Sequence, residues 1–281
     1  MTRSCISQLQ RFVSGNSNQH QVLYPHVLPL TSSVQPPAAD SDTPDTISAI
    51  KPALDVVEKH WREGWRAARV SKDEAGGKGA VIIVGKRGQD KFFSNGLDFA
   101  NATKDPSFTP NFFPLTFNPL LRRLLAFPIP TVAAINGHCF AGGMMLSLAC
   151  DYRIMTDGSK RNAWMCMNEI HFGAAWPLSF AAILRAKVPD PRVQRQIALE
   201  GHRFTPKDAL AVGLLDRIVS GDTEAVLDEA QAFAESISGL STSGAWGLIK
   251  RDLYRDVIEA SSRDVLPRNV VADDAAAKAR L

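Results

Sequence analysis

Apolar residues recur at helix-like and strand-like intervals along this chain from residue 46 onward. Between Thr46 and Arg69 they return every three or four positions, which predicts an amphipathic helix. Apolar, largely β-branched runs predict buried strands at 80–84, 131–135 and 152–156, with a helix over 142–150. This alternation of strands and helices predicts an α/β fold.

The second half of the chain is predicted to be mainly helical. Helices are expected over Leu120–Phe127, Pro177–Val188 and Arg192–Glu200, and helical spacing returns over Thr223–Ser261. Thr205 followed by Pro206 is typical of a helix start, and Gly213 of a helix end. Residues 101–118, rich in Pro and Phe, are predicted to form a loop.

Composition narrows the functional class. The 281 residues are 45% hydrophobic and carry a formal charge of +3, so the chain can bury a full core. A mild charge without a dense Lys/Arg stripe argues against a nucleic-acid partner. The longest apolar stretches are interrupted before membrane-spanning length, so no membrane partner is expected. Four cysteines without metal-ligand spacing are expected to be reduced thiols, and no metal site is predicted.

Two glycine turns carry the candidate chemistry. The strand 131–135 ends at Asn136-Gly137, and helical spacing resumes at Gly142. The free N–H groups of such a helix start bind a phosphate or a transient oxyanion. Upstream, the buried run 79–85 is followed by Phe-Phe-Ser-Asn-Gly-Leu-Asp at 92–98, which turns at Gly96.

Together, in this order, the two turns resemble those of the crotonase (enoyl-CoA hydratase/isomerase) superfamily, over residues 79–219. The resemblance implies a crotonase-type spiral of repeated ββα turns with a helical C-terminal trimerisation region. It also implies that the N–H groups of Leu97 and Gly142 bind the thioester oxygen of an acyl-CoA. CoA would be part of the substrate, and no other cofactor is expected. The N-terminal segment Leu30–Pro37 departs from the family pattern, so the CoA contacts there stay unassigned.

The carboxylates favour one branch of the superfamily. Family hydratases use two glutamates, and the first matching position is Met145 here, whereas the second is Glu169 in Asn-Glu-Ile. Hydration suits paired acid/base groups, while moving a double bond from C3–C4 to C2–C3 needs one group that shuttles a proton. This pattern resembles Δ3,Δ2-enoyl-CoA isomerases. A hydratase or dehydratase with an unrecognised base and a non-catalytic acyl-CoA-binding relative are the alternatives.

Further residues are candidates for substrate contact. The resemblance implies a group that lines the acyl-CoA site, namely Ser94, Asn95, Gly96, Phe140, Met145, Trp176 and Lys250. Lys250 either meets the CoA phosphates or belongs to a solvated helix face, and Trp176 either packs or lines the acyl tunnel. The Phe-rich segment packs against the core or roofs the acyl chain. His138 is expected to be structural, and His171 could tune the pKa of Glu169.

We expect four segments along the chain: a flexible leader (1–45), a catalytic core (46–220), a helical C-terminal region (221–272) and a flexible tail (273–281). The resemblance implies a homotrimer or a dimer of trimers. Ala279-Arg280-Leu281 resembles a peroxisomal import tripeptide, which implies an import receptor as a partner. The acid-free leader with Arg3 and Arg11 offers a mitochondrial address as the alternative.

Overall fold

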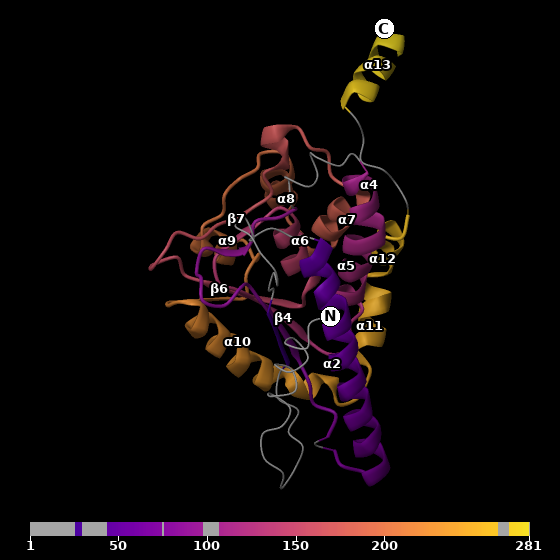
Figure 1. Cartoon of the computed structure of the whole chain (residues 1–281), viewed down its shortest axis with the longest axis vertical. Helices are drawn as coiled ribbons and strands as arrows, with labels where there is room; N and C mark the ends of the chain where they lie inside the picture. Colours follow the sequence, from indigo (N-terminus) through magenta and orange to yellow (C-terminus); the bar gives the residue numbers. More distant parts are fainter. Residues whose placement is uncertain (1–25, 30–43, 75, 98–106, 264–269, 281) are drawn as a thin grey trace.

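The computed structural model describes residues 26–29, 44–74, 76–97, 107–263 and 270–280. Within them the chain forms two parallel sheets flanked by helices (Figure 1). The larger sheet has the order β1-β2-β4-β6-β8, with β1 at His26–Pro29, β2 at Val81–Val84, β4 at Thr131–Ile135, β6 at Tyr152–Thr156 and β8 at Arg217–Val219. The smaller sheet has the order β3-β5-β7, with β3 at Phe92–Ser94, β5 at His138–Phe140 and β7 at Met165–Cys166.

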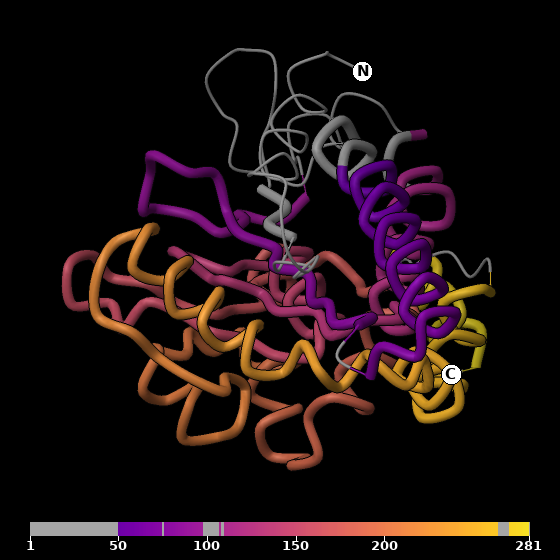
Figure 2. Tube along the Cα trace, turned by 90° about the horizontal axis from the view of Figure 1, so that it is seen from below, coloured from indigo at the N-terminus to yellow at the C-terminus, as the bar shows by residue number. Residues whose placement is uncertain are grey.

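The larger sheet is covered on both faces, which explains its continuous apolar runs. Along β2 and β4 alternate side chains enter two separate clusters, since neighbouring residues of a strand point to opposite faces. Ile82, Val84 and Val132 pack with Val226 and Ala230 of helix α10 (Thr223–Ile237). In Figure 2 this helix runs across one face of the sheet.

The other face joins the main hydrophobic core. Helix α6 (Gly142–Ala149) lies inside this core, with every residue buried, beside α5 (Asn118–Leu125) and α7 (Leu178–Lys187). The long helix α2 (Pro44–Ser71) contributes a stripe at the spacing that the sequence predicted: Ile50, Leu54, Val57 and Trp61. The indole of Trp61 donates to Gly77 O at 2.8 Å, so its one polar atom is satisfied inside the core.

Most predicted elements are confirmed, but the loop predicted over 101–118 is wrong from residue 108 onward. That segment forms α4 (Phe108–Phe112) and a π-helical turn, η1 (Phe113–Phe117), which leads directly into α5. Pro114 and Pro119 stand near the starts of η1 and α5, at the two junctions of this continuous helical segment. Residues 101–106 lie outside the described residues.

The C-terminal half is helical, as predicted. It comprises η2 (Glu169–Phe172), α8 (Pro191–Ala198), α9 (Pro206–Ala211), η3 (Ser238–Ser241), α11 (Trp246–Leu253) and α12 (Arg255–Ala260). Thr205 caps α9 by accepting the Asp208 N–H, and Gly213, with φ of +76°, follows its end. Helix α13 (Val270–Arg280), with mostly exposed side chains, occupies most of the segment expected to be a flexible tail. No helix of the described residues is long and apolar enough to cross a membrane.

Candidate active site

The smaller sheet brings both glycine turns to one edge. Its strands β3 and β5 are parallel neighbours, with Phe92 opposite His138 and Ser94 opposite Cys139. Their carboxyl ends therefore lie side by side, and the segments that follow them come into contact. A Cβ added at Gly96 would stand 2.5 Å from Ala141 Cβ and 3.4 Å from Gly142 N. This contact places the turn of Leu97 against the start of α6.

The start of α6 is held in an unusual backbone conformation. Ala141 has φ of 50° and ψ of −122°, a combination that costs energy for a residue with a Cβ. Its N–H donates to Cys166 O at 2.9 Å, and its carbonyl accepts from the N–H groups of Met144 and Met145. Gly142 is the first residue of the helix, so its N–H has no acceptor within the helix. The strained residue thereby aims a helix-start N–H out of the turn.

Ser94 builds the opposite turn. It is buried, and its Oγ accepts the Gly96 N–H at 3.1 Å, which fixes Gly96 at φ of +87°. A Cβ at Gly143 would stand 2.5 Å from Ser94 Cβ, so only glycine permits this approach of α6 to β3. Asn95 is exposed beside them, and Leu97 is half-buried against the core. The two predicted donors, Leu97 and Gly142, thus belong to turns that are packed against each other.

Glu169 follows the third strand of the same sheet. Strand β7 pairs with β5, with Phe140 opposite Cys166, so η2 begins at the edge where the glycine turns lie. Oε2 of Glu169 is buried and accepts no hydrogen bond within the described part of the chain. Burial raises the pKa of Glu169, whereas its own backbone N–H and the indole of Trp176 oppose this rise. A carboxylate with a raised pKa and a free oxygen is suited to taking and returning a proton.

Apolar and aromatic side chains adjoin these groups. Met145 is fully buried on α6, one turn after the strained Ala141. The position of the first hydratase glutamate therefore carries an apolar side chain. Trp176 contacts Phe180 edge-to-face, with ring centroids 6.2 Å apart. Phe180 in turn contacts Phe113 and Phe117 at 5.6 Å and 5.9 Å. The Phe-rich segment is thus packed against the element that carries Trp176, and its role in roofing an acyl chain stays a prediction.

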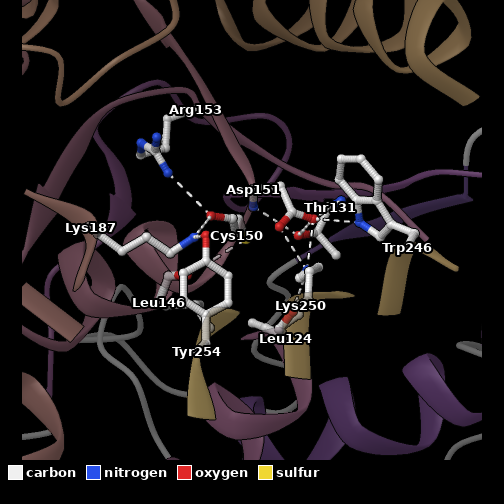
Figure 3. A network of polar contacts seen from close by, with 10 residues as sticks. All are labelled: Leu124, Thr131, Leu146, Cys150, Asp151, Arg153, Lys187, Trp246, Lys250 and Tyr254. Carbon is white, nitrogen blue, oxygen red and sulfur yellow. Dashed lines mark hydrogen bonds and ion pairs between the residues drawn. The ribbon is translucent and has the colours of Figure 1, made fainter. Parts of the chain in front are cut away.

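The structure corrects the placement of Lys250. Its ammonium is buried beneath α11 rather than on a solvated helix face, and it lies 2.7 Å from Asp151 Oδ1 (Figure 3). It also donates to Leu124 O at 2.9 Å. Thr131 and Trp246 complete the hydrogen bonds to the same carboxylate. Because these partners bind the Lys250 ammonium inside the protein, it is not available to the phosphates of CoA.

Phe140 and the two candidate histidines belong to structural contacts. Phe140 stacks on His138, which also stacks on Trp164 with ring centroids 4.8 Å apart. Nδ1 of His138 accepts the backbone N–H of Trp164. Burial and nearby cations lower the pKa of His138, which fits the structural role expected for it. His171 Nε2 faces Gly201 O at 3.3 Å, so it anchors η2 rather than contacting the Glu169 carboxylate. Phe140 thus lies in a ring cluster with His138, and its contact with substrate stays a prediction.

The described cysteines and carboxylates show no other reactive cluster. Cys139, Cys150 and Cys166 are buried thiols that form no disulfide, and burial raises the pKa of Cys150 to about 12 and that of Cys166 to about 11. Within the described ranges, no three His, Cys, Asp or Glu residues are grouped as metal ligands. Sequence reasoning missed the strained Ala141 and the buried Asp151–Lys250 pair. The pair joins residues that no local pattern connects.

The fold has two parallel sheets, and the smaller one brings two glycine turns and the Glu169 carboxylate to one edge. This arrangement defines the crotonase class of proteins. The chain belongs to the enoyl-CoA hydratase/isomerase family, whose model matches residues 70–258. The crotonase-type fold expected from the two turns is confirmed by solved structures. An enoyl-CoA hydratase from Mycobacterium ulcerans superposes with a TM-score of 0.66 at 23% identity, covering 86% of this chain and 92% of that one. An enoyl-CoA isomerase of Mycobacterium tuberculosis gives 0.65 at 22% identity, over 87% and 92%.

Sequence relatives include both isomerases and a dehydratase. Enoyl-CoA delta isomerase 3 of Arabidopsis thaliana is 32% identical over 184 residues, which cover 64% of this chain and 75% of the relative. The peroxisomal enoyl-CoA delta isomerase 2 of the same plant is 31% identical over 186 residues, with the same coverage. Carnitinyl-CoA dehydratase of Citrobacter koseri is 31% identical over 179 residues, which cover 64% of each chain. These relatives support an activity of the enoyl-CoA isomerase/hydratase type and place the chain near the isomerase branch.

Proposed function

We propose that this protein isomerises 3-enoyl-CoA to 2-trans-enoyl-CoA in fatty-acid β-oxidation. The observation that carries the proposal is that Glu169, whose Oε2 is buried and unpartnered in the described part of the chain, is combined with fully buried Met145 at the family's other carboxylate position. Glu169 takes the C2 proton while the N–H groups of Leu97 and Gly142 bind the enolate oxygen. It then returns the proton to C4. One group suffices, because no water oxygen has to be delivered to C3.

The oxyanion donors supply the remaining stabilisation. Charge builds on the thioester oxygen as the proton leaves, and a fixed N–H donor for such an oxygen contributes about 3 kcal/mol. The strain at Ala141 and the close approach at Gly96 fix both turns before substrate arrives, so little reorganisation is needed. The isomerases among the sequence relatives support this reading.

A product assay tests the proposal. Purified protein is incubated separately with 3-cis-enoyl-CoA and with 2-trans-enoyl-CoA, and the products are identified by mass and ultraviolet absorbance. The expected result is a conjugated product of unchanged mass from the first substrate and little gain of water by the second. Hydration of the second substrate at a comparable rate would replace the proposal with the hydratase alternative, which the similarity to carnitinyl-CoA dehydratase favours as second candidate.

The oligomeric state and the subcellular location of the protein are part of the proposal. A homotrimer, or a dimer of trimers, is supported by the exposed apolar face of α11, formed by Leu248, Ile249 and Leu253. Peroxisomal location is supported by the peroxisomal isomerases among the relatives. A fluorescent protein inserted ahead of the intact C-terminal tripeptide, with the leader left at the N-terminus, is expected to give punctate peroxisomal signal that becomes diffuse without Leu281. Mitochondrial signal, or signal unaffected by this deletion, would contradict the peroxisomal address.

A further inference from the structure

The two strands that carry the glycine turns are too short to fix their own alignment. β3 and β5 have three residues each, and their pairing is irregular between Phe92 and Ser94. In longer strands, an extended series of alternating side chains sets the register. A slip of one residue would displace one turn against the other by about 3.3 Å. The N–H groups of Leu97 and Gly142 could then no longer bind one oxygen, so the alignment has to be set where the strands begin.

Asn136 lies at that beginning, between β4 and β5, and is 1% exposed. Its Nδ2 shares two hydrogens among three acceptors: Lys86 O at 3.4 Å, Gln89 O at 3.3 Å and Thr223 Oγ1 at 2.9 Å. Lys86 and Gln89 belong to the loop that leads from β2 into β3, and Thr223 is the first residue of α10. One amide therefore ties the starts of both short strands to a helix of the larger sheet.

The orientation of this amide leaves its oxygen without a hydrogen bond. Oδ1 of Asn136 is buried and has no partner within the described residues. It lies so close to Gly85 that a Cβ at that glycine would collide with it. Turning the amide over would place Oδ1 against two carbonyl oxygens, so the acceptors fix the present orientation. An unpaired buried acceptor is costly, and the side chain is therefore useful to the fold through its donor side alone.

The groups around this amide make the connection rigid. Thr223 Oγ1 also lies 2.6 Å from Asp90 Oδ1, which holds the hydroxyl in place beside the amide. The N–H of His138, at the start of β5, donates to Lys91 O at 2.8 Å. A Cβ at Gly137 would stand 2.5 Å from the same carbonyl oxygen, so only glycine lets the turn before β5 approach the start of β3 this closely.

We propose that Asn136 is a positioning residue for the oxyanion donors: its amide aligns β3 with β5, and thereby sets the distance between the N–H groups of Leu97 and Gly142. The inference rests on the proposed function, in which both donors bind the thioester oxygen. Asn136 acts from the opposite ends of the two strands. Because misplacing reacting groups by about 1 Å lowers turnover by up to roughly 10²-fold, such a distant connection controls the rate.

Two variants test the connection from its two sides. Asn136→Ala removes the amide, and Thr223→Val removes one of its acceptors while keeping the shape of the side chain. Turnover of 3-cis-enoyl-CoA should fall roughly tenfold or more in Asn136→Ala, and less in Thr223→Val. KM should change by less than about twofold, because the donors act on charge that develops in the transition state. Thr223→Ser retains the hydroxyl and should restore normal turnover.

Ser241→Ala is the matched control. Ser241 is fully buried, and its hydroxyl donates to Gly77 O at 2.9 Å, a contact before β2 that includes neither β3 nor β5. This variant loses a buried hydrogen bond, as Thr223→Val does, so it should lower the melting temperature. Its turnover and KM should equal those of the unaltered protein.

A spectroscopic measurement separates positioning from stability. The carbonyl stretch of bound 2-trans-enoyl-CoA, isotope-labelled at its thioester carbon, is recorded by infrared difference spectroscopy, because hydrogen bonds to the oxygen lower its frequency. The frequency should fall below that of the free ligand in the unaltered protein and in Ser241→Ala. It should lie closer to the free value in Asn136→Ala and Thr223→Val.

A bound frequency and turnover equal to those of the unaltered protein would overturn the inference and leave Asn136 a residue that only stabilises the fold. If Asn136→Ala does not fold, Thr223→Val decides by the same two readouts, against Thr223→Ser. A different result distinguishes failure of the proposed function. If the bound ligand shows no lowered frequency in the unaltered protein, the oxyanion site itself is contradicted, and the inference falls with it.

Discussion

At the scale of single residues, Glu169 combines the features that a proton carrier needs. Its Oε2 is buried at the edge where both glycine turns meet, and this oxygen has no hydrogen-bond partner within the described residues. Burial of a carboxylate disfavours its charged form and raises its pKa, which also costs folding free energy at neutral pH. A residue that serves catalysis in this way destabilises the fold slightly.

Glu169→Gln should therefore separate function from stability. We expect turnover to fall by at least roughly 10²-fold, the scale of a positioned acid/base, because an amide cannot take the C2 proton. The melting temperature should stay equal or rise, since no charge is buried. Initial rates with 3-cis-enoyl-CoA and thermal unfolding are the measurements. Glu200→Gln, at an exposed partner of Arg195, is the control. Near-normal turnover of Glu169→Gln would remove this residue from the mechanism.

Met145 is the second residue that decides the reaction. Met145→Glu should introduce hydratase activity towards 2-trans-enoyl-CoA, because a second carboxylate would then stand one turn after Gly142. It should also destabilise the protein by at least about 2 kcal/mol, the cost of burying a polar group without a partner. Met145→Gln shares the polarity without a base, so it should lose stability without gaining hydration. Equal hydration by both variants would contradict the role given to this position.

At the scale of elements, the C-terminal helices are attached by a buried polar network. Lys250 of α11 pairs with Asp151, the residue directly before β6 (Figure 3). Lys187 at the end of α7 donates to the hydroxyl of Tyr254, between α11 and α12, at 2.9 Å. Asp151 also accepts from Thr131 of β4. The network therefore joins α11 to the end of α7 and to two strands of the larger sheet.

Breaking the Asp151–Lys250 pair should loosen this attachment. Lys250→Met leaves a buried carboxylate without its cation, and such losses cost about 3–5 kcal/mol. The double variant Asp151→Asn with Lys250→Met should recover part of this loss, because neither charge is then buried alone. Urea unfolding measures both. If Lys250→Met costs as little as exposed Lys207→Met, the pair does not contribute to stability as described.

Lys187 should make stability depend on pH. Burial lowers its pKa from 10.5 to about 8, so between these values the unfolded chain binds a proton that the native protein lacks. The free energy of unfolding contributed by Lys187 therefore rises with pH from about 8, by up to about 1.4 kcal/mol per pH unit. Cys150 opposes this above pH 9, because burial raises its pKa. Comparing the slopes of the unaltered protein and Lys187→Met isolates the lysine, and identical slopes would contradict the prediction.

At the scale of the whole molecule, three apolar side chains of α11 are exposed in the part of the chain that the structure describes. Leu248, Ile249 and Leu253 are 62%, 64% and 68% exposed. Exposed apolar residues that are grouped on one element are typical of an interface between subunits. Their position in the C-terminal region agrees with the trimer that the superfamily resemblance implied.

If the proposed trimer forms through α11, Ile249→Asp should shift its mass towards that of a monomer, because a carboxylate in an apolar interface loses its hydration. Light scattering after size-exclusion chromatography measures the mass. Val270→Asp, at a residue of α13 that is 68% exposed, is the control and should leave the mass unchanged. A trimer that persists in Ile249→Asp would show that another surface forms the interface.

The sequence by itself determined the features that depend on neighbouring residues. Strands at 81–84, 131–135 and 152–156, the amphipathic α2 and the capped α9 follow from local spacing and local hydrogen bonds. The glycine turns were also readable, since Gly96 needs positive φ and Gly143 a close approach to Ser94. The Phe-rich segment was misread because prolines indicate loops locally, although each can begin a helical turn.

Only the tertiary structure decided which distant groups meet. Lys250 and Asp151 are 99 residues apart, and periodicity cannot tell a cation that faces solvent from one that faces a buried carboxylate. The same holds for Phe180 of α7, whose ring meets Phe113 and Phe117 only because α7 packs against η1. Side-chain pairing across a core is set by the packing of whole elements, whereas turns and periodic faces are set within a few residues of backbone. The sequence thus determined where the chemistry lies, and the tertiary structure decided which partners surround it.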